Sequence, residues 1–165
     1  MRVLGVDTSL RCTGYGVVDA KGSRMTVVEQ GTIATPASQS HSRCLNHIDV
    51  EIRRIVERTR PDAVSIEGIF FCKNVKTAVV LGEARGVVIA ACAASGVPVY
   101  EYAPRRMKQA LVGFGGADKS QVGKMMAAML GLAELPEENA ADALAMAICH
   151  ANSVSRVTAL SPKAL

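Results

Sequence analysis

Two runs of apolar residues that each end on a carboxylate give the chain its most regular pattern. The first run, 3–6, is followed by Asp7, and the second, 63–66, is followed by Glu67. Each run has the length of a buried strand, and a carboxylate where a strand leaves the core must be paired, hydrogen-bonded or bound to a cation. A single Asp at a strand end usually caps a turn through its own side chain. Because the pattern is repeated, a shared site is favoured.

The first third of the chain predicts an antiparallel meander and a helix. After the first run, a polar turn and a Gly-containing segment predict a second strand that ends near Val18, and 25–34 predicts a third. Glycines in the second strand allow close approach of another backbone. Apolar residues at spacings of three and four predict an amphipathic helix over 42–59, which ends before Pro61.

The middle of the chain predicts a β-α-β unit. Residues 75–95 predict a long helix that is apolar nearly all round, and 97–102 predict a fifth strand parallel to the strand before it. Gly82 and Gly86 lie four residues apart in this helix, and each costs about 1 kcal/mol relative to Ala. We therefore expect another helix to pack closely on that face, either in the core or across a dimer.

Three further helices are predicted near the end. A short basic helix opens at Pro104, and a second follows Asp118, whose spacing from Gln121 is that of a capping box. The last helix, over about 136–151, carries Asp142 ahead of a run of small apolar residues. The pattern as a whole predicts one α/β domain over 1–152 and a tail over 153–165.

Composition sets limits on this picture. The 165 residues have 49% hydrophobic side chains, few aromatics and no Trp, so the core must be built from aliphatic residues. A net charge of +4 is compatible with a polyanionic partner. Five Cys without a C-x-x-C pair argue against disulfides and zinc, and favour a cytoplasmic protein. The longest apolar stretch is taken to be 86–97, which is too short to span a bilayer, so no membrane partner is expected.

Asp142 is the third candidate site residue. The apolar run after it should hold its helix face against the sheet, near the carboxyl ends of the first and fourth strands, where open α/β sheets bind ligands. Three converging carboxylates would repel one another unless a hard cation neutralised them, and oxygen ligands are what magnesium prefers. Two such ions can clamp a phosphodiester during hydrolysis.

Several motifs in a fixed order resemble the RuvC family of Holliday-junction resolvases, from Met1 to about Ala151. They are D-x-S-x-x-x-T-G-Y-G at 7–16, Ser65-Ile66-Glu67 followed by Phe70 and Lys73-Asn74, Leu81-Gly82-Glu83-Ala84-Arg85-Gly86, Tyr102-Ala103-Pro104 with Lys108, Ala117-Asp118-Lys119-Ser120-Gln121-Val122, and A-A-D-A-L-A at 140–145. The resemblance implies an RNase H-like fold, with a five-stranded mixed sheet of meander and parallel strands flanked by helices. It also implies a homodimer that makes paired nicks in four-way DNA junctions during recombination and repair, and a branch-migration motor as a further partner.

The resemblance further implies a catalytic and metal-binding set at Asp7, Glu67, Asn139 and Asp142, holding two Mg²⁺ ions, with Mn²⁺ as a substitute. The family usually has Asp, sometimes His, where this chain has Asn139. An amide oxygen can contact a metal but contributes no charge. Natural variation, an engineered substitution, and compensation by Glu138 are the three explanations, and an N-cap role for Asn139 is the structural alternative.

Basic residues and one aromatic complete the expected site. Lys108 and Lys119 match basic positions of the family, and Phe70 matches the residue that wedges into the opened junction, with Phe71 as its alternative. The expected DNA contacts are Phe70, Lys73, Lys76, Arg105, Lys108 and Lys119.

Two other functions are alternatives to the nuclease. An actin-like phosphotransferase also begins with a strand, an Asp and a Gly/Thr-rich turn, but it needs a duplicated domain that 165 residues do not hold. The stronger alternative is a catalytically inactive junction-binding protein, because Asn139 weakens the acidic set.

Overall fold

The computed structural model describes residues 1–68, 74–156 and 163–165. Its strands are β1 (Arg2–Asp7), β2 (Cys12–Lys21), β3 (Arg24–Ala34), β4 (Ala63–Glu67) and β5 (Val99–Tyr102). Its helices are α1 (His41–Thr59), α2 (Val75–Ala94), α3 (Pro104–Val112), α4 (Lys119–Leu130) and α5 (Glu138–Arg156).

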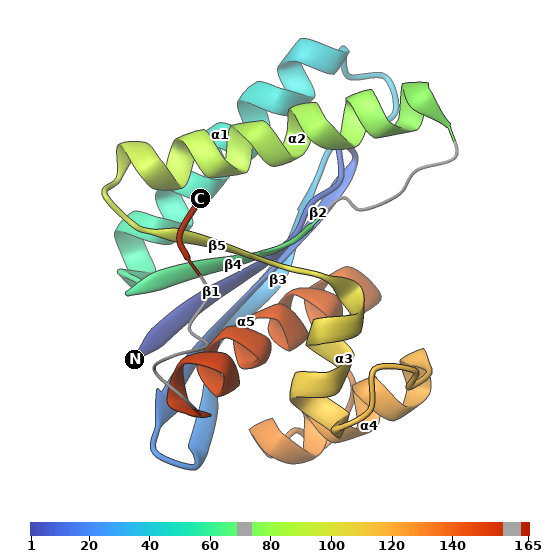
Figure 1. The fold of residues 1–165 in the computed structure, drawn as a ribbon. Helices are drawn as coiled ribbons and strands as arrows, with labels where there is room; N and C mark the ends of the chain where they lie inside the picture. The colour runs from blue at the N-terminus through green and yellow to red at the C-terminus, as the bar shows by residue number, and fades with distance from the viewer. Residues whose placement is uncertain (69–73, 157–162) are drawn as a thin grey trace.

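The strands form one mixed sheet in the order β3-β2-β1-β4-β5 (Figure 1). Strands β1, β2 and β3 pair as an antiparallel meander, while β1 with β4 and β4 with β5 pair in parallel. This confirms the predicted mixed sheet. Since Val6 lies opposite Ile66, the two parallel strands end side by side and bring Asp7 and Glu67 to the same edge.

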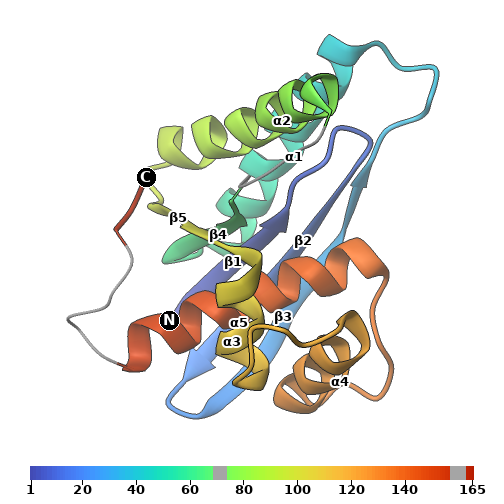
Figure 2. The same cartoon turned by 45° about the vertical axis from the view of Figure 1, so that its right-hand side comes forward.

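Helices cover both faces of the sheet (Figures 1 and 2). Helices α1 and α2 lie on one face, and α5 lies across the other with α3 and α4 beside it. Alternation along β1 divides its side chains between two cores: Leu4 and Val6 pack with α1 and α2, whereas Val3 packs with α5.

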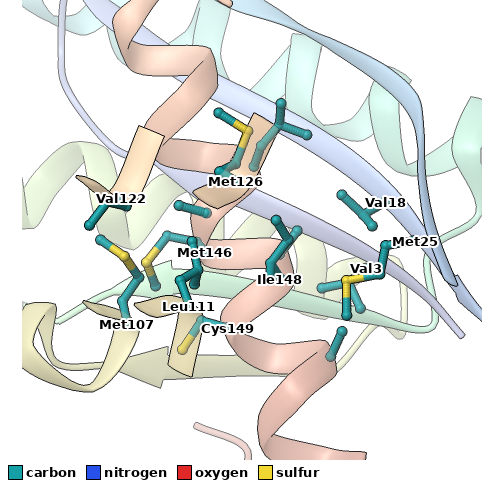
Figure 3. Packing of buried hydrophobic residues seen from close by; sticks show 14 of the residues in the cluster. Val3, Val18, Met25, Met107, Leu111, Val122, Met126, Met146, Ile148 and Cys149 are labelled. Carbon is teal, nitrogen blue, oxygen red and sulfur yellow. The ribbon is translucent and has the colours of Figure 1, made fainter. Parts of the chain in front are cut away.

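The core between the sheet and α5 is rich in methionine, as the close view in Figure 3 shows. Met107 of α3, Met126 of α4 and Met146 of α5 are all buried there. Unbranched thioether side chains fill the irregular space where these three helices meet the sheet. Tyr102 of β5 ties the sheet to α5, because its hydroxyl lies 2.8 Å from Nδ1 of the buried His150.

Several element ends differ from the prediction, and strand β2, for example, runs to Lys21 instead of ending near Val18. Strand β5 begins at Val99 instead of Val97, because the N–H of Val97 donates to the Cys92 carbonyl at the end of α2. Helix α5 continues to Arg156 instead of ending near Ala151. It is held there by Asn152, whose side chain donates to the Ala110 carbonyl of α3 over 3.1 Å.

Helix α2 is more apolar and more exposed than expected. It has 20 residues, and an 18-residue window within it has a mean hydropathy of 1.6, so it is long and apolar enough for a membrane span by length and composition. This corrects the shorter apolar stretch expected from the sequence. Two side-chain contacts attach α2 to the domain: a hydrogen bond between Glu83 and His41 of α1, and an ion pair between Arg85 and Glu101 of β5. Within the described residues, no heavy atom lies within 4 Å of a Cβ built at Gly82 or Gly86. The close helix partner expected at these glycines is therefore not in this part of the same chain.

Candidate active site

The three predicted carboxylates converge on one cavity of about 190 Å³ at the carboxyl ends of β1 and β4. Asp7 and Glu67 come from the sheet, and Asp142 comes from α5. The cavity is lined by Asp7, Glu67, Pro104, Met107, Lys108, Lys119, Val122, Asp142 and Met146.

Close contact between α5 and the sheet brings Asp142 to this cavity. A Cβ built at Gly5 would lie 1.9 Å from the Ala143 carbonyl oxygen, and one at Gly14 would lie 2.0 Å from the Asn139 carbonyl oxygen. Only glycine fits at these two sheet positions, because the helix backbone itself occupies the space of a side chain. The helix is also held by the Ser65 hydroxyl, which donates to the Met146 carbonyl over 2.8 Å.

Burial and mutual repulsion raise the pKa values of the two sheet carboxylates. The pKa of Asp7 rises to about 6, first because the group is buried and then because Asp142 and Glu67 are nearby charges. The pKa of Glu67 is raised by burial and by Asp142, and the charge of Lys108 partly opposes this. The sheet carboxylates thus lie in surroundings that favour neutralisation by a proton or a cation.

Lys119, the first residue of α4, supplies a positive charge to the cluster. Its Nζ lies 2.9 Å from Oδ2 of Asp142 and forms a second ion pair with Glu138. These two bonds raise the pKa of Lys119 above its usual value, so its ammonium is fully charged at neutral pH. The residue predicted as a DNA contact therefore also contacts a predicted metal ligand.

Asn139 lies one helical turn before Asp142 but is not among the residues that line the cavity. Its side-chain N–H donates to the Cys12 sulfur over 3.0 Å. Cys12 begins β2 and had no predicted role beyond its place in the motif. Asn139 and Asp142 are three residues apart, so they lie on the same side of α5. The side-chain amide of Asn139 nevertheless bonds to strand β2.

Among the residues that the structure describes, no three His, Cys, Asp or Glu side chains are already close enough to hold one ion. The donor set nonetheless fits a hard divalent cation, because three carboxylates from different elements line one cavity and two of them have raised pKa values. The Lys119 ammonium bonds to Asp142 at the position where such a cation would compete for the carboxylate. Asp7, Glu67 and Asp142 are the residues that could hold such a cation.

Some of the expected DNA-contact residues lie within the described part of the chain, and others do not. Phe70 and Lys73, and the alternative wedge Phe71, lie outside the described residues. Lys76 is exposed on the first turn of α2, Arg105 is exposed on α3, and Lys108 lines the carboxylate cavity.

Arg11 lies in the turn between β1 and β2. In the structure its guanidinium donates to the carbonyls of Pro36 and Gln39, over 2.9 and 3.0 Å. These bonds give Arg11 a structural role in holding the loop before α1.

The fold and the site together define a class. A mixed five-stranded sheet with helices on both faces, and carboxylates from β1, β4 and the last helix around one cavity, is the arrangement of an RNase H-like domain.

Comparison with known proteins narrows this class to one family. The family model described as "Crossover junction endodeoxyribonuclease RuvC" matches residues 3–150. The protein of that name from Caldicellulosiruptor saccharolyticus is 46% identical over 159 residues, which are 95% of this chain and 96% of the relative. The one from Chloroflexus aggregans is 47% identical over 152 residues, which are 92% and 93% of the two chains. The chain belongs to the RuvC family of crossover junction endodeoxyribonucleases.

A solved structure of this family is similar along the whole chain. The structure "T. thermophilus RuvC in complex with Holliday junction substrate" matches with a TM-score of 0.93 and 35% identity, covering 100% of this chain and 99% of that one.

Proposed function

We propose that this protein is a structure-selective endonuclease that resolves four-way DNA junctions by paired nicks in opposite strands, using two divalent metal ions. The observation that carries the proposal is the convergence of Asp7, Glu67 and Asp142 on one cavity with Lys108 and Lys119, in a chain of the RuvC family. The overall similarity to T. thermophilus RuvC in complex with a junction supports the same substrate.

Each residue of the site has a part in phosphodiester hydrolysis. Magnesium, or manganese in its place, would supply Lewis-acid stabilisation of the charge that develops on the phosphate. Asp7, Glu67 and Asp142 would hold it, and the amide oxygen of Asn139, whose amide nitrogen bonds to Cys12, would add at most a neutral ligand. Lys108 and Lys119 line the same cavity and would place positive charge beside the scissile phosphate, where preorganised charge stabilises the transition state.

A homodimer accounts for paired nicks and for the exposed apolar face of α2. Val79, Gly82 and Gly86 repeat at helical spacing along this helix and are all exposed. A second copy of the same helix can approach closely there, because nothing in the described chain fills the space over either glycine. Two copies related by a two-fold axis would present one carboxylate cavity to each of two strands.

Two expectations go with this proposal. The four Cys in the described part of the chain, Cys12, Cys44, Cys92 and Cys149, are free thiols, which supports a reducing cytoplasm. A branch-migration motor as a further partner stays a prediction from the resemblance.

The experiment that tests the proposal compares junction binding and junction cleavage. Synthetic four-way junctions and linear duplexes of the same sequence are incubated with the protein in Ca²⁺ for binding and in Mg²⁺ or Mn²⁺ for cleavage. We expect tight binding to the junction only, symmetric nicks in the presence of Mg²⁺ or Mn²⁺, and loss of cleavage without loss of binding in Asp7→Asn. Equal binding of junction and duplex would overturn the proposal.

A second candidate function, junction binding without cleavage, is favoured by one observation. The Asn139 amide adds no charge and bonds to Cys12 instead of facing the cavity. Tight junction binding with no nicks in either metal would support it.

A further inference from the structure

Glu138 does not line the carboxylate cavity, yet it contacts Lys119, which does. It starts α5, exposes 71% of its side chain, and forms an ion pair with Lys119. Glu138 and Asp142 are four residues apart on α5, so both carboxylates lie on one face of the helix. The ammonium of Lys119 bonds to both of them.

The backbone of Lys119 is fixed independently of these bonds. Asp118 caps α4, accepting from the Gln121 N–H over 2.9 Å, and the Gln121 side chain accepts from the Asp118 N–H over 3.0 Å. The mobile part of Lys119 is therefore its side chain, which has four rotatable bonds and is 61% exposed. An exposed lysine loses rotamer freedom when it is held, so one ion pair alone contributes little to its position.

Lys119 also lies between two cavities. One is the carboxylate cavity, and the other, of about 340 Å³, lies between α4, α5 and the segment that joins them. Lys119, Val122 and Asp142 line both, while Glu138 lines only the second. The Lys119 side chain can leave Asp142 without leaving Glu138, because the space on the Glu138 side is open.

We propose that Glu138 is a positioning residue: it keeps the Lys119 ammonium at the edge of the carboxylate cavity when a divalent cation takes the Asp142 carboxylate. The cation and the ammonium compete for one carboxylate, and a lysine displaced from Asp142 alone would turn into solvent. The second bond to Glu138 holds the charge within reach of the phosphate that enters the cavity. This inference rests on the proposed nuclease function and adds to it a residue outside the acidic set.

The first test follows the ammonium directly, without DNA and without catalysis. In protein labelled with ¹⁵N-lysine, the NH₃⁺ signal of Lys119, assigned by its loss in Lys119→Arg, should stay visible after Ca²⁺ is added. It should broaden beyond detection in Ca²⁺-loaded Glu138→Gln, because the hydrogen bond that protects it is gone. Glu137→Gln is the matched control, since it removes the same charge from the neighbouring exposed residue. A Lys119 signal that persists in Glu138→Gln with Ca²⁺ would overturn the proposal.

Calcium affinity tests the competition for Asp142. By calorimetry without DNA, Lys119→Met should bind Ca²⁺ several-fold more tightly than the unchanged protein, because its competitor is removed. Lys108→Met makes the same charge change in the same cavity, where no bond to Asp142 is found among the described residues, and should give a smaller gain. An equal gain in Ca²⁺ affinity in the two variants would mean that only the loss of a positive charge near the cavity matters. Competition between Lys119 and the cation for Asp142 would then be ruled out.

The last test is a double-mutant cycle on single-turnover junction cleavage. Glu138→Gln should lower the rate at saturating junction and metal by about tenfold, the lower end for residues that orient a site. Junction affinity should change less than twofold, and the melting temperature should stay the same because the ion pair is exposed.

In the Lys119→Met background, Glu138→Gln should have no further effect, because Glu138 acts through Lys119. Additive losses would overturn the proposal. If the unchanged protein neither binds nor cleaves junctions, the nuclease proposal fails by itself, while the NMR and calcium results still decide the role of Glu138.

Discussion

The two faces of the sheet are packed in different ways. Towards α1 and α2 the sheet presents Leu4, Val6 and Val17, so the helices are held away from it by full-sized side chains. Towards α5 it presents Gly5 and Gly14, and the helix backbone lies directly against the strands. The first face forms an ordinary hydrophobic core. The second face fixes the distance between the sheet and α5, the helix that carries Asp142.

This difference explains where precision is needed. Asp142 must meet Asp7 and Glu67 across a helix–sheet boundary, and a shift of α5 by the size of a methyl group would move it relative to both. On the opposite side, α2 carries no residue of the carboxylate cavity and keeps an open surface of small residues. The sheet positions under α5 have no space for a larger side chain, whereas the outer surface of α2 has space for a partner.

The largest effect should come from adding an atom on the tight face. Gly5→Ala places a methyl group 1.9 Å from the Ala143 carbonyl oxygen, and this contact can be relieved only by moving backbone. We expect a loss of about 3 kcal/mol or more in the free energy of unfolding, measured by urea denaturation. A loss below 1 kcal/mol would show that α5 is less tightly seated than the structure indicates.

The carboxylates on the same face should make stability depend on pH when no divalent cation is present. The pKa of Asp7 is raised in the folded state from 3.8 to about 6, so the folded protein binds the proton more tightly than the unfolded chain. Its stability should therefore fall as pH rises from about 4 to 6, by up to about 3 kcal/mol. Above pH 6, Asp7→Asn should be more stable than the unchanged protein by this amount.

The difference between the two proteins, followed by thermal unfolding in EDTA from pH 4 to 8, isolates the contribution of Asp7. A difference that is constant over this range would contradict the raised pKa. Added Mg²⁺ should reduce the difference at pH 7, because a bound cation neutralises the ionised carboxylate.

Asn139→Asp should strengthen the metal site at the start of α5. The carboxylate restores a fourth negative charge, and the Cys12 thiol can change from accepting a hydrogen bond to donating one. We expect a 10- to 100-fold faster cleavage rate and a lower magnesium requirement, as for residues that tune a metal. Adding Asp7→Asn should abolish cleavage in either background. If rate and magnesium dependence stay unchanged, position 139 is not a metal ligand.

The smallest effect should come from the open face. Gly82→Ala in α2 meets no described atom within 4 Å and should stabilise the isolated chain by about 1 kcal/mol through helix propensity. Gly82→Arg at the same place should leave the chain folded but shift it from dimer to monomer in sedimentation equilibrium. A dimer that survives Gly82→Arg would place the interface elsewhere.

Much of the fold followed from the pattern of the sequence, and the reasons are local. Strand ends at Asp7 and Glu67, the amphipathic α1 and the capping box at Asp118 each depend on residues close together along the chain. The convergence of Asp142 with the strand ends followed from the rule that ligands bind at the carboxyl ends of parallel strands. All of these are confirmed by the structure.

The parts that could not be predicted depend on side chains far apart in the sequence. The bond from Asn139 to Cys12 and the pairing of Lys119 with two carboxylates arise only when α4, α5 and β2 are in place. The exposure of one face of α2 could not be predicted either. An apolar helix has the same composition whether it is buried in its own chain or against another. Only the Gly82 and Gly86 spacing gave a signal, and it left both readings open.

The bond between Tyr102 and His150 gives the molecule a built-in optical reporter. The chain has three Tyr and no Trp, so tyrosine alone dominates its fluorescence and near-ultraviolet dichroism. Tyr100 and Tyr102 both contact His150 on α5, with ring centroids 4.4 and 5.9 Å away. The seating of the helix that carries Asp142 can therefore be followed by spectroscopy on the unlabelled protein, without an introduced probe.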